Sequence, residues 1–148
     1  MEKRSLTIVK CIDGTIENVF DAWIDPMRVA EWYGPENMIN EIQEMNAVEG
    51  GAYRLVMKAP DGSTHPLHGV FKTVERPNKL VMTWQWENMN EKTHTTPAET
   101  SVTTCFKGIG DVQTEVRMTH EGFEDEEAQK SHEAGWNEAF ARLARLFG

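Results

Sequence analysis

Alternation of apolar and polar residues limits most strongly what this chain can fold into. Between residues 79 and 87, every second side chain is large and apolar: Leu80, Met82, Trp84 and Trp86. Successive side chains of a β-strand point to opposite faces, so this spacing predicts a strand with one buried face. Comparable runs, separated by turn signals, predict further strands at about 5–12, 40–47, 52–58, 65–75, 101–107 and 112–120. We therefore expect an antiparallel sheet with one covered face.

Helical spacing appears in three further segments. Apolar residues recur from Ile16 to Trp23 and predict a short helix over about 15–24, and Pro26 opens a second at about 26–32. A long helix is predicted over about 125–147, and one arc of it carries Ala128, His132, Gly135, Trp136, Ala139, Leu143 and Leu146. Only this helix is long enough to cover the sheet. The chain therefore predicts an α+β fold in which a curved antiparallel sheet grips a long C-terminal helix, with two short helices after the first strand.

Length, charge and cysteine content narrow the class of protein. The 148 residues fit one domain, 1–148, that needs neither metal nor disulfides for its core. A net charge of −9 argues against nucleic acid and membrane surfaces as partners, because both attract clustered cationic side chains. The chain has no signal-peptide pattern and no apolar run of the roughly 18 residues that a membrane span needs. Cys11 and Cys105 lie in alternating runs, so we expect buried free thiols and a cytoplasmic location.

The sequence predicts no metal site and no cofactor. His65 and His68 are three residues apart on a predicted strand, which places them on opposite faces. His94 lies in a long polar loop, with no thiol or carboxylate at ligand spacing. Nucleophile-elbow, phosphate-loop and dinucleotide-binding motifs are absent from the sequence. Arg54 and Glu115 are a candidate ion pair across the sheet.

Four segments carry a resemblance to a known family. They are AWIDPMRVAEWYGP at 22–35, EGGAYRLVM at 49–57, HGVFKTVERPNKLVMTWQWE at 68–87, and THEGF followed by HEAGWNEAFARLARLF within 119–147. In this order, over nearly the whole chain, they resemble the START-like, SRPBCC superfamily with its helix-grip (Bet v 1-like) fold. Within it they resemble the activator of heat-shock protein 90 ATPase homologue family. The resemblance implies the helix-grip fold and a ligand-binding cleft between sheet and helix, but it supplies no shared catalytic motif.

The candidate ligand-binding residues are large side chains expected to face that cleft. Apolar walls with a few polar points are typical of small-molecule pockets, and methionine adapts to varied ligand shapes. The candidates are Trp32, Tyr33, Tyr53, Leu55, Met57, Met82, Trp84, Trp86, Phe106, Met118, His132 and Trp136. The alternative for each apolar member is ordinary core packing. For Trp32 and Tyr33 there are two interpretations: they form the rim of the cleft, or they act as a staple that packs the short helix against the sheet.

His132 has two readings of its own. It lies on the apolar arc of the final helix, where an imidazole without a hydrogen-bond partner is costly. One reading makes it a polar contact for a ligand or an acid–base group. The other makes it a core histidine bonded to a neighbour. No catalytic residue is assigned.

The leading hypothesis is binding of a small hydrophobic or amphipathic molecule, including lipids, in the cleft. One alternative is a small-molecule enzyme, since relatives with this fold perform cyclisation, hydrolysis or dehydration; it requires two titratable groups that meet at the cavity. The other is a chaperone-regulating interaction module with a role in stress response, which requires an exposed apolar patch on the outer sheet face. The sequence does not determine the oligomeric state, and a homodimer is one alternative.

Overall fold

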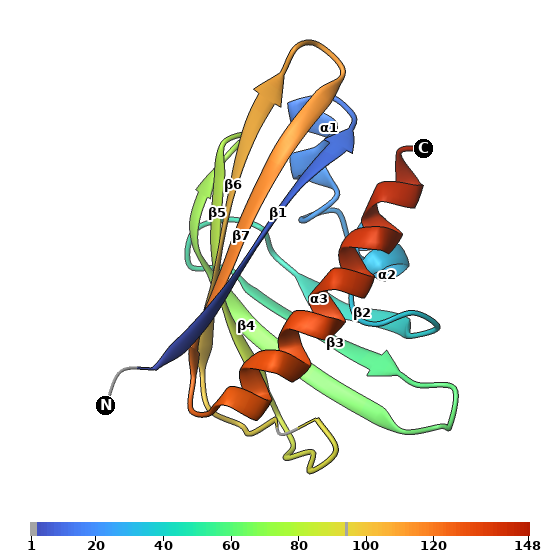
Figure 1. The fold of residues 1–148 in the computed structure, drawn as a ribbon, viewed down its shortest axis with the longest axis vertical. Helices are drawn as coiled ribbons and strands as arrows, with labels where there is room; N and C mark the ends of the chain where they lie inside the picture. The colour runs from blue at the N-terminus through green and yellow to red at the C-terminus, as the bar shows by residue number, and fades with distance from the viewer. Residues whose placement is uncertain (1–2, 94) are drawn as a thin grey trace.

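The structure is a computed structural model that describes residues 3–93 and 95–148 (Figure 1). His94, predicted to lie in the polar loop, falls outside the described residues. Within them the strands are β1 (Arg4–Asp13), β2 (Ile39–Met45), β3 (Ala52–Lys58), β4 (Thr64–Glu75), β5 (Lys79–Trp86), β6 (Thr100–Ile109) and β7 (Gln113–Phe123). The helices are α1 (Ile16–Asp21), α2 (Pro26–Trp32) and α3 (Glu126–Leu146). The predicted order of elements is confirmed.

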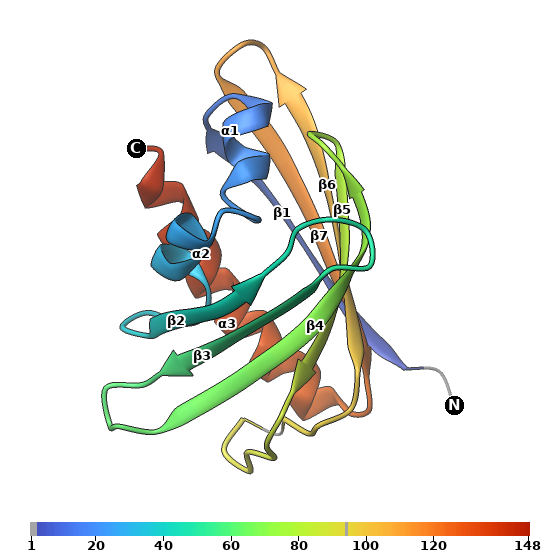
Figure 2. The same cartoon turned by 180° about the vertical axis from the view of Figure 1, so that it is seen from behind.

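All strands join one antiparallel sheet in the order β1-β7-β6-β5-β4-β3-β2. β1 and β2 are consecutive in the chain but form opposite edges, and α1 and α2 make the connection between them. In Figure 1, α3 crosses in front of the curved sheet, and in the reversed view of Figure 2 it lies behind the sheet. The helix therefore covers one face only, as the alternating pattern predicts, and the helix-grip architecture is confirmed.

Both cysteines lie on the outer face of the sheet, which corrects the prediction that they are buried. Cys11 in β1 and Cys105 in β6 are both free and exposed, not buried. They alternate with residues that face the helix, such as Ile12 and Phe106, which are buried. Strand alternation places a residue on one face or the other, but it was wrong to take the apolar neighbours of a thiol as evidence for its own burial.

The first short helix is shorter than its apolar spacing predicts. Thr15 caps α1 by accepting a hydrogen bond from the Asn18 N–H, but the helix ends at Asp21. Asp25 then caps α2 in an extended conformation, with Pro26 in the first turn. A residue that precedes proline is disfavoured in the helical region, so the chain must leave α1 before it reaches Asp25.

Aromatic side chains from α1, α2, α3 and the sheet fill the core at one end of the grip. Trp23, just after α1, stacks on Trp136 of α3 with ring centroids 5.9 Å apart. Trp32 lies edge-on to Trp23 at 4.7 Å, and its indole N–H donates to the Ala22 carbonyl at 2.8 Å. This packing ties the two short helices to α3 and leaves the other end of the grip less completely filled.

Candidate functional site

A pocket of about 600 Å³ lies between α3 and the concave side of the sheet. Its lining comes from the loop after α2, from β3 to β5, from the β3–β4 connection, from residues 89–93 and Thr95, and from α3. Figures 1 and 2 both place the β5–β6 connection at the same end of the molecule as the N-terminal half of α3. Segments distant in sequence thus form one pocket.

The inner wall of the pocket is aromatic and sulfur-containing. Trp84 and Trp86 come from β5, where alternate residues face the helix, and Trp136 comes from α3. The Trp84 and Trp136 ring centroids are 5.0 Å apart. Met38 and Met57 add flexible thioether side chains to the same lining. The wall offers a ligand large, polarizable apolar surfaces.

His132 is bonded through both ring nitrogens. Its Nδ1 lies 2.7 Å from the Ala128 carbonyl oxygen, so Nδ1 carries the proton and donates it. Its Nε2 accepts the indole N–H of Trp86 at 3.0 Å. Burial lowers the pKa of His132, opposed by the bond to Ala128. Both ring nitrogens of the neutral imidazole are therefore engaged in hydrogen bonds. Neither is free to bind a ligand as long as Trp86 donates to Nε2.

A second indole–imidazole pair lies behind the first. The indole N–H of Trp136 donates to Nδ1 of His120 at 3.0 Å. Nε2 of His120 therefore carries the proton and donates to Thr100 Oγ1 at 2.7 Å, and that hydroxyl donates to the Trp84 carbonyl. Burial, and then the neighbouring His132, lower the pKa of His120 well below its usual value. The two histidine rings, 5.2 Å apart, are both held neutral.

Arg142 fixes the part of the pocket wall that follows α2. Its guanidinium donates to the carbonyls of Tyr33, Gly34, Pro35 and Met38 at 2.8 to 3.2 Å. Gly34, Pro35 and Met38 line the pocket. One side chain near the end of α3 thus satisfies the carbonyls of an irregular segment and holds it against the helix.

The pocket mouth carries a chain of polar groups. Ser63 Oγ donates to Asp61 at 2.6 Å, and the Ser63 hydroxyl lies 3.1 Å from Nε2 of His65. Nδ1 of His65 faces the Asn90 amide at 3.4 Å and so accepts, which leaves Nε2 as the donor to Ser63. The bonds from Ser63, with smaller contributions from Lys92 and His65, lower the pKa of Asp61. Because the serine proton points to the carboxylate and not to the imidazole, this chain does not activate Ser63 as a nucleophile.

The structure divides the predicted site residues into two groups. Met57, Trp84, Trp86, His132 and Trp136 line the pocket. The others lie in the packed core and do not line it: Trp32, Tyr33, Tyr53, Leu55, Met82, Phe106 and Met118.

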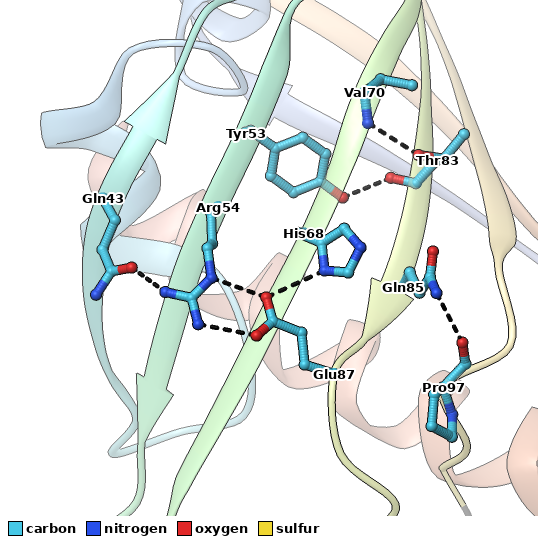
Figure 3. Close-up of polar contacts among 9 residues, drawn as sticks. All are labelled: Gln43, Tyr53, Arg54, His68, Val70, Thr83, Gln85, Glu87 and Pro97. Atoms are coloured by element: carbon cyan, nitrogen blue, oxygen red, sulfur yellow. Dashed lines mark hydrogen bonds and ion pairs between the residues drawn. The ribbon is translucent and has the colours of Figure 1, made fainter.

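Two tyrosines of the core group show why they do not reach the pocket. The Tyr53 hydroxyl donates to the Thr83 carbonyl at 2.5 Å (Figure 3). The Tyr33 hydroxyl donates to the Met82 sulfur at 3.9 Å. Burial raises the pKa of both tyrosines, so both stay neutral donors. Trp32 donates a hydrogen bond to the Ala22 carbonyl. The positions of Trp32 and Tyr33 therefore agree with the interpretation that they act as a staple in the core.

Sequence patterns missed most of the polar mouth. The β3–β4 connection supplies Asp61, Ser63 and His65, and the β5–β6 connection supplies Asn90, Glu91, Lys92, Thr93 and Thr95. The sequence correctly predicts a turn for the first segment and a long loop for the second. Neither pattern indicates that the two segments lie close together. The odd spacing of His65 and His68 was the available signal, since it put one histidine on each face of β4.

His68 lies on the outer face with an ion-pair cluster. Arg54 binds Glu87 through two bonds of 2.8 Å, and His68 Nδ1 lies 3.0 Å from the same carboxylate (Figure 3). Arg54 also donates to Gln43. The bond from Arg54 lowers the pKa of Glu87. Arg54 therefore pairs with Glu87, which directly follows β5, and not with Glu115, which lies in β7.

The described residues offer neither a metal site nor a membrane-spanning helix. Across residues 3–93 and 95–148, no three His, Cys, Asp or Glu side chains gather closely enough to hold a metal ion. No helix in the described part of the chain is long and apolar enough to cross a membrane.

Comparison with solved structures places the fold. A Chromobacterium violaceum protein superposes with a TM-score of 0.85 at 21% identity, over 97% of this chain and 96% of that one. The solution structure of an Arthrobacter aurescens protein gives 0.82 at 24%, over 97% and 85%. The AHSA1 protein of Silicibacter pomeroyi gives 0.81 at 22%, over 97% and 96%.

Comparison with family models identifies the family of the chain. None of the curated proteins compared with the sequence matched it. The family model described as "Activator of Hsp90 ATPase homolog 1-like protein" matches residues 13–148. That match spans nearly the whole chain, including all the segments that line the pocket. The chain therefore belongs to the family of proteins like activator of Hsp90 ATPase homolog 1.

Proposed function

We propose that this protein binds a small hydrophobic or amphipathic molecule in the pocket between α3 and the sheet. The observation that carries the proposal is an open pocket of about 600 Å³ with an aromatic and methionine inner wall. Pockets for small molecules generally measure roughly 300–1,000 Å³ and are mostly apolar. Lipids are one class of such ligands. A cytoplasmic location and a role in stress response stay predictions from the sequence.

The hydrogen bonds of the inner wall support apolar recognition. Trp86, Trp136 and His132 use their polar nitrogens on one another or on His120 and Ala128. The indole nitrogen of Trp84 is buried, with no partner among the described residues. The inner wall therefore offers a ligand mainly apolar contact, which is worth about 25 cal/mol per Å² before the cost of association.

Neither alternative has comparable support. The polar chain at the mouth brings Asp61 and His65 to the same serine, but the proton positions do not suit nucleophilic attack. For a chaperone-regulating module, the large exposed apolar side chains of the described surface lie on several separate segments: Val9, Met27, Ile39, Val48, Met89, Ile109 and Val112. Of these, only Ile109 and Val112 share a segment, the β6–β7 turn, and two such residues do not make a large docking patch.

A pocket-filling variant tests the proposal. Gly135 lies on α3 and lines the pocket, and a Cβ added there meets only Pro35, at ordinary contact distance. Gly135→Leu should fill the pocket without loss of stability, because leucine favours a helix more than glycine does. We expect the neutral dye N-phenylnaphthylamine to bind the unaltered protein saturably, with increased fluorescence, and to lose most of this binding in Gly135→Leu.

The matched control is Ala134→Leu, at the adjacent exposed position of α3. It should keep dye binding, because residue 134 does not line the pocket. Equal dye binding by the unaltered protein and Gly135→Leu, with both folded by circular dichroism, would contradict the proposal.

A further inference from the structure

The charged groups that line the pocket lie at its mouth, and at its inner end the indole nitrogen of Trp84 is the buried polar atom without a partner among the described lining residues. Both nitrogens of His132 and the indole nitrogen of Trp86 are engaged in hydrogen bonds. At the mouth, Asp61 uses only one carboxylate oxygen, for Ser63. Glu91 and Lys92 line the pocket without an ion pair among the described residues. A ligand with one charged end would therefore place that end outward.

The charge at the mouth is net negative. Among the described residues of the lining there are two carboxylates, Asp61 and Glu91, and one ammonium group, Lys92. The ammonium group of Lys92 contributes to lowering the pKa of Asp61, so part of the ammonium charge is already balanced within the protein. The whole chain carries −9, which adds a long-range attraction for cations and a repulsion for anions.

The inner wall has the same preference. The faces of aromatic rings carry a negative potential and attract cations, most strongly in tryptophan. Trp84, Trp86 and Trp136 all line the pocket. A fatty-acid carboxylate at the mouth would meet the negative charge of Asp61 and Glu91, whereas an ammonium group that approaches the indoles gains attraction from them.

We infer that the ligand of this pocket is a cationic amphiphile, with a protonated amine at the mouth beside Asp61 and Glu91 and an apolar body against the tryptophans. This inference rests on the proposed function and names the chemical class of its ligand.

The test is a series of three ligands with one naphthalene body. Naphthylethylamine, naphthylethanol and naphthylacetate carry a positive, a neutral and a negative end at about pH 7.5. Dissociation constants are measured by calorimetry at low and moderate salt. We expect the amine to bind about tenfold more tightly than the acetate, with the alcohol between them, and added salt to reduce the difference.

Two charge-matched variants locate the effect. Asp61→Asn combined with Glu91→Gln should bring the amine and the acetate close to equal affinity. Glu115→Gln combined with Glu75→Gln makes the same change in net charge on β7 and at the far end of β4, away from the pocket lining, and should keep the preference.

The outcomes separate this inference from the proposed function. Binding of the alcohol, with the acetate as tight as or tighter than the amine, overturns the cationic preference and leaves apolar binding standing. An amine preference that survives in the Asp61→Asn, Glu91→Gln variant also overturns it. If no member of the series binds and the dye does not bind either, both proposals fail.

Discussion

The hydrogen bond from Trp86 to His132 decides what the inner end of the pocket offers a ligand. His132 stands on the apolar arc of α3, where the sequence left open a ligand contact and a satisfied core histidine. The structure gives it two partners, Ala128 and Trp86, which favours the second reading. The donor on β5 lies 46 residues away, so helical periodicity alone gives no sign of it.

Arg142 is the residue whose removal should loosen the pocket wall most. Arg142→Gln removes donors to four carbonyls in the 33–38 segment. Hydrogen bonds from charged groups are worth roughly 1.5–3 kcal/mol each when both partners stay shielded, and partial exposure reduces this. We expect Arg142→Gln to lower the free energy of unfolding by about 2 kcal/mol, measured by urea denaturation, and to weaken dye binding.

Arg145→Gln is the control for that change. Arg145 is also in the last turns of α3, but it forms an exposed ion pair with Glu36. Such pairs contribute at most about 1 kcal/mol. Equal losses of stability in the two variants would show that the carbonyl contacts of Arg142 are not special.

At the scale of elements, the segment between α2 and β2 sets the shape of the pocket through one glycine. Gly34 has a φ of +81°, and a Cβ built there would lie 2.8 Å from the sulfur of Met57. Gly34→Ala therefore imposes both backbone strain and a clash with a pocket-lining side chain. We expect a loss of about 1–3 kcal/mol in unfolding free energy and a shift of Met57 that alters dye affinity.

Gly62→Ala separates the two causes. Gly62, in the β3–β4 connection, has a φ of +90° but nothing within 4 Å of the added Cβ. It should show the backbone strain alone. A Gly34→Ala variant no less stable than Gly62→Ala, with unchanged dye affinity, would contradict the expected clash.

At the scale of the whole molecule, the two buried histidines make stability depend on pH. Their pKa values are lowered in the folded protein, whereas the unfolded chain titrates near the ordinary value of 6.5. Below that pH the unfolded state binds more protons, so stability is full above about pH 6.5 and is lost as the pH falls toward the folded pKa values. We expect a slope approaching about 1.4 kcal/mol per pH unit for each histidine that stays neutral.

Urea denaturation between about pH 8 and pH 5 measures this slope. His120→Gln keeps an amide beside Trp136 and Thr100 but cannot titrate. It should be less stable than the unaltered protein at neutral pH and should show a flatter dependence on pH. An unchanged slope in this variant would mean that other groups cause the acid sensitivity.

Local patterns were sufficient for the elements and their order. The bounds of α2 and β3 match those predicted from the sequence, because Pro26 fixes the start of α2, and Gly51 precedes a run in which Tyr53, Leu55 and Met57 recur at every second position. The predicted end of α1, at about residue 24, lies beyond the observed end at Asp21. Asp25 must be extended to cap α2, and this requirement ends α1 although the apolar spacing continues. The burial of the cysteines was predicted wrongly, because it depends on which face of the sheet is covered.

The site was predictable only in part. Trp84, Trp86 and Trp136 are the kind of residue that a pocket wall needs, and so are Met82 and Phe106, which lie in the core. Residue type and periodicity are the same for both groups. What separates them is whether a second side chain fills the space opposite, and that depends on how α3 crosses the sheet.

By itself, the sequence determined an antiparallel sheet with one apolar face, a long amphipathic helix to cover it, and the family to which the chain belongs. Those properties follow from periodicity and from motifs that are local in the chain. Only the tertiary structure decided that a pocket remains between the sheet and the helix and that Trp86 donates a hydrogen bond to His132. It also decided that two loops bring Asp61 and Glu91 to the mouth of this pocket. These contacts join residues far apart in sequence, and they are fixed by the curvature of the sheet and the packing of the helix upon it.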